Sequence, residues 1–77
     1  MHLTSADALK LLGKSIKQCR KQKGLTQEEL GFLCNLHRQQ ISMIERGLLD
    51  LRYLTLLKIF KILNIPKDLI LYSTKLD

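Results

Sequence analysis

The sequence predicts an all-α domain of five helices. The chain has 77 residues with one Pro and four Gly, and it is rich in Leu, Lys and Gln, which favour helix. Hydrophobic residues make up 45% of it, as is typical of a folded chain rather than a disordered one. This length is enough for one small core and too short for two. We therefore expect residues 1–77 to form a single domain.

The chain is basic, with a net charge of +6 from 13 basic and 7 acidic residues. This balance suits a polyanionic partner, because Lys and Arg release counterions from phosphates, although a merely soluble basic protein has the same balance. No apolar run approaches the roughly 18 residues of a membrane span, and the first residues do not resemble a signal peptide. We expect a cytoplasmic protein in which Cys19 and Cys34 are free thiols at apolar helix positions.

The first helix is expected from about Ala6 to Gln22. Thr4 or Ser5 can cap it, and Gly24 ends it. Its apolar face has spacings of three and four residues, and it consists of Leu9, Leu12, Ile16 and Cys19. The basic residues 20–23 either complement the helix dipole or contact phosphate.

Two short helices follow. The second begins after Thr26 and closes near Cys34, because Thr26 and Glu29 have the spacing of a capping box. The third runs from about Arg38 to Arg46 and ends at Gly47.

A tight turn joins these two helices. Asn35 lies in the turn, where a residue tolerant of positive φ is needed, and Gly31 lies where the helix axes come closest. The apolar residues that pack the two helices together are Leu30, Cys34, Leu36, Ile41 and Ile44. Two helices joined in this way can deliver the second one into the major groove of DNA.

The fourth helix is expected from about Leu51 to Leu63, with Asp50 as its cap and Asn64 at its end. Its inward residues are expected to be Leu54, Leu57, Phe60 or Ile59, and Leu63. The connection before it is apolar, through Leu48, Leu49 and Leu51, and the sequence does not say whether these residues face the core, a partner or DNA.

A fifth helix is expected from about Pro66 to Tyr72, because Pro suits the first turn of a helix, and residues 73–77 are expected to fray. The apolar residues of region 62–72 exceed what one end of a small core can bury. They either form a homodimer interface or complete the core of the single chain. The residues proposed for the interface are Ile62, Ile65, Leu69, Ile70, Leu71 and Tyr72.

Three stretches carry a family resemblance: residues 12–16, 20–30 and 41–47. Residues 20–30 read Arg-Lys-x-Lys-Gly-Leu-Thr-Gln-Glu-Glu-Leu, and residues 41–47 read Ile-Ser-x-Ile-Glu-Arg-Gly, where x is a position outside the motif. Together they resemble the lambda-repressor-like, Xre-type helix-turn-helix regulators. The turn at 35–38 and the short chain look most like the controller proteins of restriction-modification systems. This resemblance implies a compact five-helix fold with a helix-turn-helix core at 27–46. It also implies a transcriptional regulator without cofactor that binds a pseudo-palindromic operator in double-stranded DNA as a homodimer.

The resemblance also implies roles for single residues. The positions matching the base readers of the family are His37, Arg38, Gln39 and Met43. Gln27 matches the residue that touches phosphate and braces the reading side chains, while Gln40 and Ser42 touch the DNA backbone or pack. Glu45 and Arg46 match a structural pair that ties the third helix to the domain.

The chemistry of the side chains agrees with reading of bases. The fork of Arg38 matches guanine O6 and N7, and Gln39 can both donate to and accept from adenine. Arg38 can instead contact phosphate. Met43 either sits on a thymine methyl or packs without base contact. His37 caps the third helix or contacts phosphate or base; many relatives have Ser or Thr at its position.

Other classes of function fit less well. The same fold serves antitoxin-type interaction modules whose main partner is a toxin protein, and this is the principal alternative. The sequence has no Cys-x-x-Cys pair that would indicate a metal site, and no Ser-His-Asp arrangement or Gly-rich phosphate loop that would indicate catalysis. It gives no sign of a pocket for a small-molecule ligand. Two Tyr and two Phe provide few aromatic rings for stacking RNA bases. Glu28 is a candidate for contact with RNA polymerase.

Overall fold

The computed structural model describes residues 5–65, and within this range it contains four helices. They are α1 (Ser5–Gln22), α2 (Gln27–Cys34), α3 (Arg38–Glu45) and α4 (Tyr53–Leu63). The all-α class predicted from the sequence is confirmed. The predicted fifth helix, 66–72, lies outside the described residues, and so do Leu69, Ile70, Leu71 and Tyr72 of the predicted dimer interface.

The start and end of α2 follow the local sequence signals. Thr26 Oγ1 accepts from the Glu29 N–H at 3.0 Å, and the Thr26 N–H donates to Glu29 Oε1 at 2.9 Å, which is the predicted capping box. The Thr26 backbone N–H, with a smaller contribution from its side chain, holds the pKa of the Glu29 carboxyl below its usual value. Asn35 ends the helix with a φ of 58°, in the left-handed region that Asn tolerates.

The start of α4 corrects two sequence predictions. Its N-cap is Arg52 rather than Asp50, and the Arg52 side chain makes no capping hydrogen bond. Leu54 is 77% exposed, although it was expected to face inward. The buried side of α4 contains Ile59, Phe60 and Leu63, which follow the half-buried Leu56 by three, four and seven residues. Leu54 therefore lies on the opposite side of the helix.

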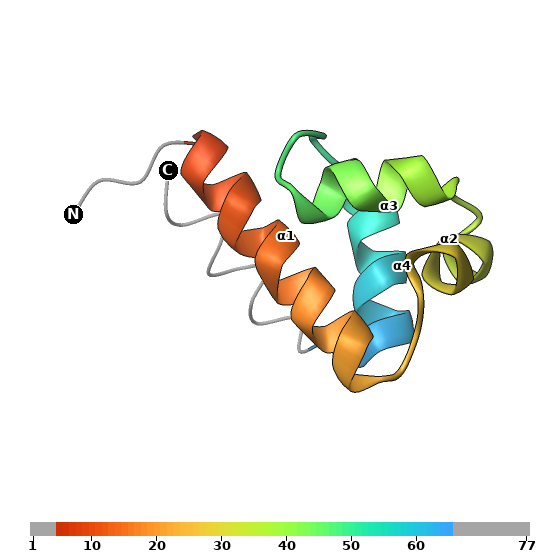
Figure 1. Cartoon of the computed structure of the whole chain (residues 1–77). Helices are drawn as coiled ribbons and strands as arrows, with labels where there is room; N and C mark the ends of the chain where they lie inside the picture. The colour runs from red at the N-terminus through yellow and green to blue at the C-terminus, as the bar shows by residue number, and fades with distance from the viewer. Residues whose placement is uncertain (1–4, 66–77) are drawn as a thin grey trace.

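The core lies where all four helices meet. In Figure 1, α1 runs along one side of the molecule and α2 lies at the other; α3 and α4 each pack against both of them. The buried apolar residues are Ile16, Leu30, Cys34, Ile41, Ile44, Ile59, Phe60, Leu63 and Ile65. Burial raises the pKa of the Cys34 thiol, partly opposed by the charge of Lys58, so Cys34 acts as a small apolar residue.

Two glycines allow the helices around α3 to approach closely. A Cβ at Gly31 would lie 2.5 Å from the Leu36 carbonyl oxygen, which confirms the expected need for Gly there, although the neighbour is the turn rather than the α3 axis. A Cβ at Gly13, on α1, would lie 2.7 Å from the Glu45 carbonyl oxygen of α3. The position of α3 on α1 therefore depends on a residue without a side chain.

Gly13→Ala is expected to lower the free energy of unfolding by about 1–3 kcal/mol, as overpacking does. Ala is the better helix former by about 1 kcal/mol. However, the new methyl group would meet atoms of the α3 backbone, which cannot move aside by a change of rotamer as a side chain can. Urea unfolding followed by circular dichroism measures the change. Ser15→Ala, at an exposed position of the same helix, is the control and should be near neutral. A Gly13→Ala protein as stable as the wild type would show that α1 and α3 do not pack this closely.

Candidate nucleic-acid interface

Helix α3 has one buried side and one open side. Ile41 is 0% exposed and Ile44 is 3% exposed, and both face the core that α1 and α2 complete. Arg38 and Gln39 are exposed, whereas Ser42 and Met43 are half-buried. The predicted reading side chains thus lie on the part of α3 that the rest of the domain leaves accessible.

The first turn of α3 is fixed by side chains. His37 is the N-cap, and its Nδ1 accepts from the Gln39 N–H at 3.2 Å. The His37 N–H donates in turn to Gln40 Oε1 at 2.9 Å. The predicted capping role of His37 is confirmed. Gln40, expected on the DNA backbone or in packing, is held at this cap through its side-chain oxygen.

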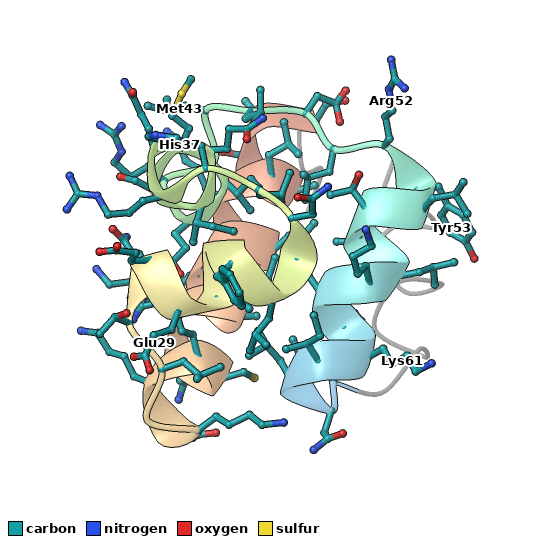
Figure 2. All side chains as sticks on the ribbon, turned by 90° about the vertical axis from the view of Figure 1, so that its right-hand side faces the viewer. Glu29, His37, Met43, Arg52, Tyr53 and Lys61 are labelled. Atoms are coloured by element: carbon teal, nitrogen blue, oxygen red, sulfur yellow. The ribbon has the colours of Figure 1, made fainter. Side chains whose placement is uncertain are left out.

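A polar hollow lies between the beginnings of α2 and α3. It is lined by Gln27, His37, Arg38, Gln39 and Ser42. These are all the residues predicted to touch DNA except Gln40 and Met43. Figure 2 shows Met43 at the same end of the molecule as His37. The structure thus gathers side chains from two helices into one surface with both donors and acceptors.

A buried ion pair anchors the far end of α3. Arg20 Nε lies 2.6 Å from Glu45 Oε2, and the two side chains are 8% and 2% exposed. Arg20 Nη2 donates to Glu45 Oε1 at 3.1 Å and Nη1 to the Leu25 carbonyl at 2.8 Å. Glu45 thus ties α3 to the domain, as expected. Arg46 does not share this role, because it is exposed and its Nε donates to the Ser42 carbonyl of the same helix at 3.4 Å.

The ion pair also fixes Gln27. Gln27 Nε2 donates to Glu45 Oε1 at 3.0 Å, so the carboxylate of α3 orients the side chain that begins α2. Arg20 lies inside the domain and is removed from the basic residues available to phosphate. A single network therefore sets the relative positions of α1, α2 and α3.

One further basic residue lies at this end of the molecule and was not singled out from the sequence. Arg52 is exposed, and Figure 2 shows its side chain pointing out at the same end of the molecule as His37 and Met43. Arg52 was not predicted as a site residue because it follows an apolar, Leu-rich connection.

The structure also shows where the Leu residues of that connection lie. Leu49 and Leu51 are half-buried against the core, while Leu48 is 59% exposed.

Two other kinds of site have no counterpart in the described range. Among residues 5–65, no three His, Cys, Asp or Glu side chains are grouped so that they could hold a metal ion. In that part of the chain, no helix has the length and apolarity needed to cross a membrane.

Comparison with known proteins places the chain in a family. The Helix-turn-helix family model HTH_3 matches residues 16–70, and the chain belongs to this family. It is 42% identical over 66 residues to the control protein C.BamHI of Bacillus amyloliquefaciens, covering 83% of this chain and 82% of that protein. It is 34% identical over 59 residues to the uncharacterized HTH-type transcriptional regulator y4dJ of Sinorhizobium fredii, covering 77% of each.

Solved structures agree. The crystal structure of the restriction-modification controller protein C.AhdI from Aeromonas hydrophila matches with a TM-score of 0.74 and 34% identity, over 84% of this chain and 97% of that one. The clp gene regulator ClgR from Corynebacterium glutamicum shares the fold, with a TM-score of 0.75 at 21% identity over 99% of this chain and 95% of that one.

These findings confirm the resemblance drawn from the motifs. The protein is a helix-turn-helix transcriptional regulator of the DNA-binding class, with restriction-modification controllers among its relatives. The family is one of DNA-binding regulators and not of enzymes.

Proposed function

We propose that this protein binds a pseudo-palindromic operator as a homodimer, reads the major groove with α3, and controls the genes of a restriction-modification system from the cytoplasm. The observation that carries this proposal is the polar surface formed by the starts of α2 and α3, on a chain with a net charge of +6. The relatives named as controllers support the choice of genes. Two copies are needed because one recognition helix covers too few base pairs to select a genomic site.

The residues have distinct proposed roles. Arg38 and Gln39 read guanine and adenine, and Met43 meets a thymine methyl. Gln27, held by Glu45, presents its remaining amide hydrogen to a phosphate, as does the hydroxyl of Ser42. Gln40 supports this surface through the cap of α3.

The dimer interface is proposed within region 62–72. Of its described members, Ile65 is 6% exposed and belongs to the core of the single chain, whereas Ile62 is half-buried and retains surface for a partner. Glu28, exposed on α2, is proposed to contact RNA polymerase on the bound operator.

Selection of binding sites from random duplex DNA tests this function at near-physiological salt. We expect enrichment of a two-fold symmetric site with half-site centres ~34 Å apart, one helical turn of DNA. If no motif is enriched and binding disappears as salt is raised, only non-specific attraction to phosphate remains, and the proposal is wrong.

A protein partner is the second candidate function, as in an antitoxin-type module. Phe32 is 85% exposed and Leu33 is 51% exposed. With Leu25 and Thr26 they line a largely apolar hollow on α2 next to two carboxylates. Exposed apolar surface of this kind marks interfaces. A stable complex with a second protein, combined with a failed site selection, would favour this alternative.

Arg52→Ala is expected to weaken binding to operator and to random DNA by the same factor. Its charge faces the same side as the reading helix, so we assign it to a phosphate, which carries no sequence information. The slope of log K against log salt should fall by about 0.9 for each copy. Fluorescence anisotropy at several salt concentrations measures both quantities. Lys61→Ala removes an equal charge from a side chain that points elsewhere (Figure 2) and should leave the slope unchanged; an unchanged slope for Arg52→Ala would exclude the contact.

A further inference from the structure

We propose that His37 acts through both ring nitrogens: Nδ1 caps α3, and the proton on Nε2 is donated to a hydrogen-bond acceptor on the DNA. This inference rests on the proposed function and specifies one contact within it. The acceptor is a phosphate oxygen or an acceptor atom on a base edge.

The tautomer follows from the cap. A neutral imidazole has one N–H and one acceptor nitrogen. Nδ1 accepts from the Gln39 N–H at 3.2 Å, so the ring proton is on Nε2. The His37 N–H is held by Gln40 Oε1 at 2.9 Å, so the backbone that carries the ring is fixed as well. The hydrogen bond of one nitrogen thus sets the chemistry of the other.

The position of the imidazole ring allows its Nε2 proton to reach a bound DNA. His37 lines the hollow that contains Gln27, Gln39 and Ser42. It also lines a second hollow with Glu28 and Arg38. Within residues 5–65 no side chain or carbonyl accepts from Nε2. Figure 2 shows the residue at the same outer end of the molecule as Met43, where the proposed DNA surface lies.

A shorter capping residue would separate the two roles. Asn is among the strongest N-cap residues, so His37→Asn keeps an acceptor for the Gln39 N–H. Its side chain is shorter than the imidazole and does not reach the Nε2 position. His37→Ser is a second capping variant with a still shorter side chain. It controls for any effect on DNA affinity that is specific to the Asn side chain. His37→Ala removes both functions.

The experiment measures stability and DNA affinity of the three variants at pH 7.5. We expect the Asn and Ser variants to unfold at nearly the wild-type urea concentration and the Ala variant at a lower one. We expect the Asn and Ser variants to bind the selected operator about five- to a hundredfold more weakly, because each of two copies loses one neutral hydrogen bond. The slope of log K against log salt should not change, since a neutral donor releases no counterion.

Three results would overturn the inference. Wild-type affinity in both capping variants would leave His37 as a cap alone. A lower salt slope would indicate an imidazolium, in which Nδ1 cannot accept. Equal stability of the Ala and Asn variants would show that the His37 side chain does not cap α3, and the assignment of the tautomer depends on that cap.

The same variants identify the acceptor on the DNA. A changed base preference at one position of each half-site would identify a base edge as the acceptor, and an unchanged preference would identify a phosphate. Failure of the wider function is distinguishable, because the wild type itself would then enrich no site.

Discussion

Arg20→Ala is expected to lower the free energy of unfolding by about 3–5 kcal/mol, the typical loss when one partner of a buried ion pair is removed. The Glu45 carboxylate, 2% exposed, would keep its charge in the interior with Gln27 as its one remaining partner among the described side chains. The Leu25 carbonyl would lose the donor that Arg20 supplies. For a domain of this size such a loss is a large part of the total stability. Urea unfolding at pH 7 measures it.

The control for this experiment is Lys21→Ala. Lys21 is the neighbouring basic residue and is exposed, so the same change of charge should alter stability by less than about 0.5 kcal/mol. The double variant Arg20→Met with Glu45→Leu removes both charges and should recover part of the loss, because apolar replacements of a buried pair are often tolerated. Similar small effects for Arg20→Ala and Lys21→Ala would mean that the ion pair is not buried in solution.

The same network has a consequence for DNA binding. Glu45 Oε1 accepts from Gln27 Nε2 at 3.0 Å, and Gln27 lines the hollow together with Arg38 and Gln39, the proposed base readers. In Arg20→Ala protein that remains folded at low temperature, we therefore expect weaker operator binding even though Arg20 touches no DNA. The loss would arise from a misplaced α3 and a less ordered Gln27.

The sequence predicted α2 and the turn after it well because the signals that begin and end this helix are local. Thr26 and Glu29 are three residues apart, and Asn35 takes its positive φ within its own turn. The open side of α3 was also accessible to local reasoning, since the spacing of the buried Ile41 and Ile44 defines which side of the helix remains open. The family motif then gave each open position its expected role.

Contacts between distant residues were not predictable in this way. Arg20 and Glu45 are 25 positions apart, and nothing in the basic residues 20–23 distinguishes the one that is buried. Gly13 gave no turn or cap signal, because its constraint is the α3 backbone. Leu54 was misplaced because its apolar character was weighed above its position: the exposed Lys58 and Lys61 follow it by four and seven residues and mark the same side of α4. Arg52 was overlooked because it follows an apolar connection.

Arg38→Ala is expected to remove the preference for guanine at one base pair of each half-site. A bidentate contact between Arg and guanine discriminates by about 1–3 kcal/mol, so a homodimer that loses two of them should bind its operator about 2–6 kcal/mol more weakly. The exposed position of Arg38 in the hollow at the start of α3 makes a purely structural effect small. Affinity for random DNA should change little, because the other basic residues still contact phosphates.

Site selection with the Arg38→Ala protein, followed by titration of operator and random duplexes, measures both effects. Arg46→Ala is the matched control, since it removes the same charge from an exposed residue at the other end of α3. We expect it to lower both affinities by the same factor, through the lost attraction to phosphate, and to leave the selected sequence unchanged. If Arg38→Ala behaves like this control, Arg38 contacts phosphate and the guanine preference must come from another side chain. If the guanine disappears from the selected site while random binding persists, Arg38 reads that base, and the orientation of α3 set by Glu45 and Gly13 is the one that reaches the major groove.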